Sequence, residues 1–345
     1  MKLGMGARPW AGLDIGSYSV KLVALHPGAT RARYAEAVIP RALAGDEPPA
    51  PAILAGLIDD CMTRIEQSPR SFRGISIGVS GPDVIVKQLT LPLMDEAEIP
   101  GALRFEARKY LPFDVQTLVL DHQVLARNAA ERRLDVLLAT VAQQRLDRSL
   151  APLRELGVEA GIVDAAPLAL ANALRHALPR ETTADGEGHL LVDLGHRGSW
   201  LTLRHRGLPF FSRRLDWGGA ILTQAVAAAL GGSLERAEAW KLDAGVTLSH
   251  DGPESTAARL VIEQLVEEVR RSLAYYATLA PMPPALSLHV SGGTSRLAGL
   301  VELLGEQLEL PAATFSPLDS HERGVRLPAG GPQYAQAFGL ALRME

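Results

Sequence analysis

Two short segments carry an aspartate and a glycine at the spacing of a tight turn. The fifteen residues from Asp14, DIGSYSVKLVALHPG, and the fifteen from Asp193, DLGHRGSWLTLRHRG, share Asp at the first position, Gly at the third and fifteenth, Leu at the ninth and His at the thirteenth. Each is typical of a strand, a turn at Asp-x-Gly and a second strand. Because the two segments lie about half a chain apart, a duplicated domain with equivalent hairpins is the preferred interpretation.

Such hairpins suit phosphate chemistry. Glycine lets a ligand approach the backbone closely, and a run of N–H groups at the tip can hold phosphate oxygens. Ser17 adds a hydroxyl donor and Lys21 a positive charge. Asp14 and Asp193 are suited to holding a hydrated Mg²⁺ through its waters. A plain Asx-type turn explains either segment alone, but two in equivalent positions favour a phosphate site.

A third motif lies near the C-terminus. Leu286–Val290 is typical of a short apolar strand, and Ser291-Gly292-Gly293-Thr294 follows it before an apolar helical pattern from Leu297 to Leu304. A strand, a glycine-rich turn and a helix form the layout of a nucleotide site at a helix N-terminus. An ordinary connecting loop is the alternative. The chain has neither a G-x-G-x-x-G fingerprint nor a Walker GKT or GKS sequence, which disfavours those two nucleotide-binding folds.

Length and composition limit the class of protein. The 345 residues suffice for about two structural units, and 47% hydrophobic with 21% charged residues exclude a disordered chain. The net charge of −4 gives no basic surface, so we expect no nucleic-acid partner. The single cysteine, Cys61, fits a reducing compartment. No apolar run reaches the length of about 18 residues that a membrane helix needs, and the first ten residues lack a secretory core. We therefore expect a cytoplasmic protein.

Strand and helix patterns alternate between loops, which predicts an α/β fold. Turn-forming residues predict loops at Gly45–Pro51, Glu181–Gly188, His250–Ser255 and Pro281–Pro284. Apolar and β-branched residues predict strands within Ser17–Leu25 and Ile75–Leu91, and helical spacing predicts helices over Ala52–Glu66 and Ala257–Ala277.

The order and spacing of the three motifs resemble the actin-like ATPase superfamily, which includes actin, sugar kinases, chaperone ATPases and FtsA. Within it, the chain is similar to the PilM family of pilus-assembly proteins. The similarity rests on DIGSYSVKLVAL, ALRFEARKYLPFD, VLDHQVL, LVEEVRRSLAYY, VSGGTSRLAGL and AQAFGLALR, which run from residue 14 to residue 343. EARKYLPFD is the strongest single indicator, and the resemblance covers about Trp10 to Arg343.

This resemblance implies an actin-like (ribonuclease H-like) two-lobe α/β fold, with ATP or ADP and Mg²⁺ in the cleft between the lobes. The first lobe is expected at residues 1–90 and 162–187, an inserted FtsA/PilM-type subdomain at 91–161, and the second lobe at 188–345 with a helical subdomain at 223–287.

The resemblance also assigns site residues. The first phosphate motif matches Asp14, Gly16, Ser17 and Lys21, the second matches Asp193 and Gly195, and the adenosine motif matches Gly292, Gly293 and Thr294. Asp14 and Asp193 are expected to hold Mg²⁺ through water. Glu268, Arg271 and Ser272 share one helical face and are expected against the adenosine, the alternative being a solvated Glu–Arg pair.

Two departures from the superfamily pattern concern catalysis. His196-Arg197 replaces smaller residues at the second phosphate turn, so these side chains either reach phosphate or narrow the site. Ala166 precedes Pro167 where related ATPases carry the Glu that positions the attacking water, and a methyl group cannot accept a proton. Asp164 is the candidate substitute. We therefore predict that ATP is bound and hydrolysed slowly or not at all.

By the same resemblance, the chain is expected to be an ATP-binding scaffold of the type IV pilus inner-membrane assembly complex. It would capture the N-terminal cytoplasmic peptide of PilN between the first lobe and the inserted subdomain, and reach the inner membrane and other pilus components through that partner. Leu103, Tyr110 and Phe113 are candidates for this groove, with core packing as the alternative. A small-molecule kinase of the same superfamily, or an FtsA-like or secretion-system scaffold, are the alternative functions.

Overall fold

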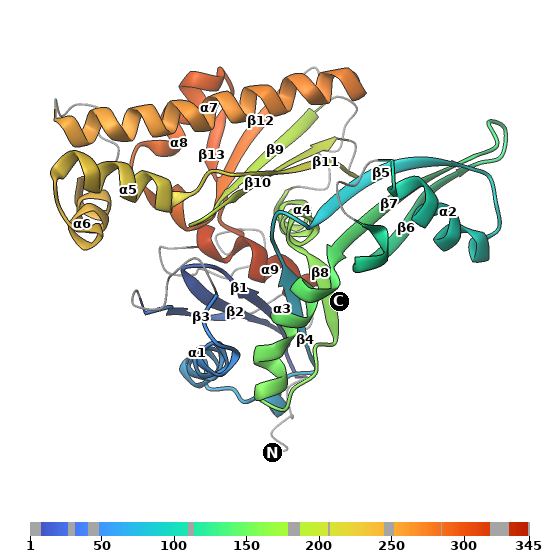
Figure 1. The fold of residues 1–345 in the computed structure, drawn as a ribbon, viewed down its shortest axis with the longest axis horizontal. Coiled ribbons are helices and arrows are strands. Elements are labelled where there is room, and N and C mark those ends of the chain that lie inside the picture. The colour runs from blue at the N-terminus through green and yellow to red at the C-terminus, as the bar shows by residue number, and fades with distance from the viewer. Residues whose placement is uncertain are drawn as a thin grey trace, which may run out of the picture.

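Two five-stranded sheets of identical strand order form the framework of the molecule (Figure 1). The computed structural model describes residues 8–26, 32–40, 48–109, 114–178, 187–205, 208–244, 252–283, 285–317 and 331–343. The first sheet has the order β3-β2-β1-β4-β8, and the second has the order β11-β10-β9-β12-β13.

Each sheet combines an antiparallel meander with two parallel strands. The first contains β1 (Trp10–Ile15), β2 (Ser19–Leu25), β3 (Ala32–Val38), β4 (Gly74–Val79) and β8 (Ile162–Ala165). The second contains β9 (Glu187–Leu194), β10 (Ser199–His205), β11 (Leu208–Leu215), β12 (Ala285–Ser291) and β13 (Ala312–Thr314). In both, the first three strands pair antiparallel, and the fourth and fifth run parallel to the first. The second sheet therefore repeats the topology of the first, as the two Asp-x-Gly segments predict.

A third, antiparallel sheet of order β5-β7-β6 lies between β4 and β8 in the chain. Its strands are β5 (Ile85–Pro92), β6 (Leu118–Asn128) and β7 (Arg133–Ala142), and helix α2 (Ile99–Ala107) covers it (Figure 1). This small sheet begins at Ile85 and has its own apolar core. Helix α3 (Gln143–Glu155) lies within the predicted insert 91–161, yet it packs against α1 (Pro51–Arg64) beside the first sheet. The insert boundaries stay a prediction.

The layer between the two large sheets is built mainly by two helices, α4 (Ala166–Ala177) and α9 (Ala335–Leu342) (Figure 1). A Cβ on Gly339 would lie 1.8 Å from the carbonyl oxygen of Ala169, so only glycine permits this close approach. The apolar core around these helices takes residues from both sheets. Trp200 of β10 also donates a hydrogen bond from Nε1 to Ser80 Oγ, 2.9 Å away. The two lobes thus share one packed interface.

Four helices cover the outer part of the second lobe: α5 (Gly219–Leu230), α6 (Leu234–Ala244), α7 (Pro253–Leu279) and α8 (Leu300–Leu308). Helix α7 begins at Pro253, inside the loop predicted at His250–Ser255, because proline fits the first turn of a helix. Short 3₁₀ turns lie at Pro69–Ser71, Glu96–Glu98, Val115–Thr117, Gly293–Arg296 and Pro332–Tyr334. None of the helices that the structure describes is long and apolar enough to cross a membrane.

Candidate nucleotide-binding site

The turns of the two repeated hairpins face each other across the lobes. Asp14 is the penultimate residue of β1 and Asp193 the penultimate residue of β9, so the two carboxylates occupy equivalent positions. The Gly16 N–H donates to the Ser19 carbonyl at 3.0 Å and closes the first turn. The ring of Tyr18 in the first turn lies 5.2 Å from the ring of His196 in the second. The two hairpins, which the sequence predicts to be equivalent, therefore also lie next to each other at their turns.

Asp14 is held from two directions. Gln336 of α9 donates from Nε2 to Oδ1 at 2.8 Å, and the Lys21 ammonium lies 3.5 Å from Oδ2. The side chains of Asp14 and Lys21 are 13% and 11% exposed. Burial raises the pKa of Asp14, while the charge and hydrogen bond of Lys21 lower it. The carboxylate is thus oriented and poorly hydrated, which favours binding of a further cation.

Asp193 has a matching environment in the second lobe. Ser291, the last residue of β12, donates from Oγ to its Oδ1 at 2.8 Å. The net pKa of Asp193 is raised to about 6, chiefly by burial; the charge of Asp14 also raises it, while the hydrogen bond from Ser291 and the charge of Lys21 lower it. Asp14, Lys21 and Asp193 therefore form one electrostatic unit with two acidic groups and one ammonium.

The glycine-rich loop after β12 packs directly on the second hairpin. Gly292 has φ +88°, and a Cβ there would lie 2.4 Å from the Leu194 carbonyl oxygen, so this position requires glycine. Thr294 Oγ1 donates to the Gly195 carbonyl at 3.0 Å, and the Gly219 N–H of α5 donates to the same oxygen at 2.9 Å. A Cβ on Gly293 would meet no atom within 4 Å, so this residue borders open space.

A buried polar cluster that the sequence motifs did not indicate adjoins this loop. Lys241 is 8% exposed and donates from Nζ to Thr223 Oγ1 at 2.8 Å, to Glu238 at 3.0 Å and to the Gly219 carbonyl at 3.3 Å. A Cβ on Gly219 would lie 2.5 Å from Thr294 Oγ1. Gly219 therefore connects this cluster to Thr294 of the predicted adenosine motif. Its sequence signal is a Glu and a Lys three residues apart on α6.

Glu268, Arg271 and Ser272, the helix residues predicted to lie against the adenosine, belong to α7. Arg213 of β11 pairs with Glu268 at 3.6 Å and donates to Ser272 Oγ at 3.3 Å. Arg271 pairs with Glu268 on the same helix. These contacts fasten α7 to the edge strand of the second sheet. The role of these residues against adenosine stays a prediction.

Asp164 is 5% exposed and both of its carboxylate oxygens are engaged. Arg343 donates from Nε to Oδ2 at 2.9 Å, and the Ala165 N–H donates to Oδ1 at 2.9 Å. Burial raises the pKa of Asp164 and the charge of Arg343 lowers it. These partners describe a structural anchor between β8 and the C-terminal helix, and a catalytic role for Asp164 stays a prediction.

Of the predicted groove residues, Leu103 is 2% exposed and packs in the core between α2 and the small sheet. It therefore faces that core, as in the core-packing alternative considered from the sequence, and does not line an open groove. Tyr110 and Phe113 lie outside the described residues. Ser17 lies exposed in the turn of the first hairpin.

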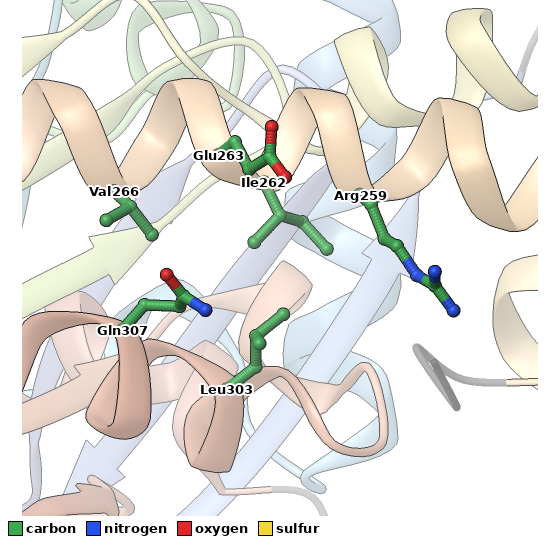
Figure 2. Close-up of a pocket in the computed structure, with 6 residues that line it drawn as sticks. All are labelled: Arg259, Ile262, Glu263, Val266, Leu303 and Gln307. Atoms are coloured by element: carbon green, nitrogen blue, oxygen red, sulfur yellow. The ribbon is translucent and has the colours of Figure 1, made fainter. Parts of the chain in front are cut away.

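A separate cavity of about 350 Å³ lies between α7 and α8 (Figure 2). Its lining is half apolar and half polar: Ile262, Val266 and Leu303, with Arg259, Glu263 and Gln307. It contains none of the residues that the sequence motifs indicate. Among the residues that the structure describes, no cluster of three or more His, Cys, Asp or Glu side chains is arranged to hold a metal ion directly.

Comparison with known proteins identifies the family. Residues 12–345 match the family described as type IV pilus assembly protein PilM. The chain belongs to the PilM family. A solved PilM–PilN type IV pilus biogenesis complex is similar at 27% sequence identity and a TM-score of 0.80, over 97% of this chain and 98% of that one.

More distant structures share the fold. The ethanolamine utilization protein EutJ from Carboxydothermus hydrogenoformans matches 98% of this chain and 90% of its own at 15% identity and a TM-score of 0.60. MreB5 of Spiroplasma citri bound to ADP matches 97% of this chain and 96% of its own at 13% identity and a TM-score of 0.53. This PilM-family chain has the predicted actin-like α/β fold. The small-molecule kinase alternative is not favoured.

Proposed function

We propose that this chain is a nucleotide-binding scaffold of the type IV pilus inner-membrane assembly complex, and that it holds the N-terminal cytoplasmic peptide of PilN. The observation that carries the proposal is the similarity to a PilM–PilN complex along almost the whole length of both chains. A cytoplasmic chain of this kind reaches the inner membrane, and other pilus components there, through its partner.

The three loops fit ATP or ADP with Mg²⁺. Gly16 and Gly195 permit the tight hairpin backbone, since a Cβ would lie 3.1 Å from the Ser19 carbonyl oxygen at Gly16 and 2.4 Å from the Gly198 carbonyl oxygen at Gly195. The N–H groups of these turns would hold phosphate oxygens, and Lys21 would supply a positive charge beside them. The carboxylates of Asp14 and Asp193 are oriented by hydrogen bonds from Gln336 and Ser291. Carboxylate oxygens are ligands suited to a hydrated Mg²⁺. Bound Mg²⁺ would offset the raised pKa of both carboxyls by stabilising their charged forms.

The adenosine would adjoin Gly293, which borders open space, and the neighbouring Lys241–Glu238 cluster. All three N–H groups of Lys241 already have partners within the protein, so this cluster would support the loop beside the adenosine through the Gly219 carbonyl. The nucleotide then acts as a structural ligand that stabilises the closed lobes. Hydrolysis is expected to be slow, because Ala166 has no acid–base chemistry and Asp164 is engaged by Arg343.

The peptide site is proposed between the first sheet and the small sheet. Strand β8 is the edge of the first sheet and β6 the edge of the small sheet. The charge of Asp121 on β6 raises the pKa of Asp164 on β8, so these two edges lie near each other. Val163 on β8 is 41% exposed. An extended peptide can pair with such an edge through its backbone and place alternate side chains in apolar contacts.

Calorimetric titration with a synthetic peptide of the PilN N-terminus tests this function. We expect saturable binding of the cognate peptide and none of a scrambled one. Val163→Lys should weaken binding at least about tenfold, because it places a charge against the apolar peptide face. Val38→Lys is the matched control, since Val38 is 50% exposed on β3, the opposite edge of the same sheet. Equal effects of both substitutions, or no peptide binding, would overturn the proposal.

A further inference from the structure

The rings of Tyr18 and His196 form a contact between the two lobes. Their centroids are 5.2 Å apart and the planes are inclined at 52°. Tyr18 precedes β2 of the first sheet, and His196 follows β9 of the second. Both side chains are half-buried. An aromatic contact of this geometry contributes about two- to twelvefold to an equilibrium.

Each ring is fixed to its own lobe through the backbone. The Ile39 N–H donates to the Tyr18 carbonyl at 2.9 Å, which ties the first turn to the end of β3. The Ala220 N–H of α5 donates to the His196 carbonyl at 2.8 Å, which ties the second turn to the helical part of its lobe. Separation of the lobes must therefore lengthen the distance between the two rings.

The rings also lie beyond the carboxylates along each hairpin. Asp14 and Asp193 are still within β1 and β9, whereas Tyr18 and His196 belong to the turns that follow. Phosphates held on the N–H groups of both turns and on a Mg²⁺ at the carboxylates would lie between the strand ends and the rings. His196 is also one of the two residues that depart from the superfamily pattern at this turn, where smaller side chains are usual.

We propose that Tyr18 and His196 form a clasp over the phosphates, which holds the lobes together around a bound nucleoside di- or triphosphate and slows its release. This inference rests on the proposed nucleotide binding and adds its regulation. The clasp slows release, because the ring contact must break before the phosphates can leave. In this proposal the rings contact the phosphate side of the nucleotide and do not select its base. Adenine and guanine nucleotides that bind are retained alike by this contact.

The test is a double-mutant cycle on dissociation of a fluorescent N-methylanthraniloyl ADP, measured by stopped flow in the presence of Mg²⁺. Tyr18→Ala and His196→Ala should each raise the dissociation rate constant about two- to twelvefold. The double variant should match the larger single effect, because each substitution removes the same contact. Tyr18→Phe, which keeps the ring, should retain the wild-type rate. His205→Ala, on the same hairpin at the far end of β10, is the matched control.

A second readout needs no nucleotide. In the free protein, Tyr18→Ala should speed hydrogen exchange in the second turn at residues 195–198, although the substitution lies in the other lobe. Additive effects on release, unchanged release, or tighter binding in either variant would overturn the clasp. A wild-type protein that binds no nucleotide would instead refute the proposed nucleotide function, so the two failures are distinguishable.

Discussion

Asp14 and Asp193 hold the same place in two copies of one hairpin, and each is oriented by a hydrogen bond from a residue far along the chain. Gln336 of α9 donates to Asp14, and Ser291 of β12 donates to Asp193. Both residues are only partly exposed, and the charge of Asp14 raises the pKa of Asp193. Two acidic groups so placed disfavour each other's ionisation unless a cation lies with them.

Replacing either carboxylate should separate nucleotide affinity from stability. Asp193→Asn removes the negative charge proposed to hold hydrated Mg²⁺ but keeps an oxygen that accepts from the Ser291 hydroxyl. We expect at least about a tenfold loss of Mg²⁺–ADP affinity by calorimetry, with an unchanged or higher melting temperature of the free protein because a buried charge is gone. Asp216→Asn, whose side chain is 90% exposed, is the control. Equal affinity for Mg²⁺–ADP in Asp193→Asn would contradict a carboxylate role.

The affinity for Mg²⁺–nucleotide should depend on pH through Asp193. Its pKa is raised from 3.8 to about 6, so the free folded chain gains stability from the neutral carboxyl below pH 3.8 and loses this gain as the pH rises through 6. Magnesium selects the charged form, so affinity should fall about tenfold between pH 7.5 and pH 5. Titrations in EDTA over the same range report the protonation of the nucleotide itself. A pH-independent affinity after that correction would exclude Asp193.

Asp164 should matter for stability more than for turnover. Asp164→Asn leaves Arg343 without its carboxylate partner and should lower the free energy of unfolding by about 1–3 kcal/mol in urea denaturation. ATP turnover, already slow, should stay the same. A wild-type turnover rate comparable to that of chaperone ATPases, abolished by Asp164→Ala, would reverse this assignment and make Asp164 the catalytic base.

The parts of the site that local chemistry dictates were predictable. Asp14, Asp193 and Gly292 were candidates from the sequence because tight turns at strand ends favour such residues within a few positions, and their role toward a nucleotide stays a prediction. The hydrogen bonds of Gln336 and Ser291 were not predicted, although Ser291 lies in the glycine-rich motif, because these neutral side chains meet the carboxylates only through tertiary packing. Lys241 had only the weak signal of a Glu three residues before it, because its burial depends on the contact between α5 and α6. Leu103 was ambiguous because an apolar residue on a short helix suits a core and a groove equally.

Lys241 is expected to serve both stability and binding. Lys241→Met leaves the Glu238 carboxylate, which is 16% exposed, without its ammonium, and should cost about 3–5 kcal/mol of unfolding free energy. Adding Glu238→Gln should restore most of that stability, because the carboxylate charge is removed while an oxygen remains for the Thr223 hydroxyl. Nucleotide affinity should remain low in the double variant, since Lys241 no longer holds the Gly219 carbonyl beside Thr294. Recovery of both properties together would limit Lys241 to a structural role.

Two adjacent glycines offer the sharpest separation of fold from ligand binding. Gly292→Ala forces a side chain into a left-handed backbone and into the Leu194 carbonyl, 2.4 Å away, and should cost more than about 2 kcal/mol in unfolding free energy. Gly293→Ala meets nothing within 4 Å, so the free protein should melt at the wild-type temperature. Its methyl group would nevertheless project into the space proposed for the nucleotide and should weaken ADP binding. Wild-type affinity in Gly293→Ala would show that the nucleotide does not lie against this loop, because a bound nucleotide there would have to contact the added methyl group.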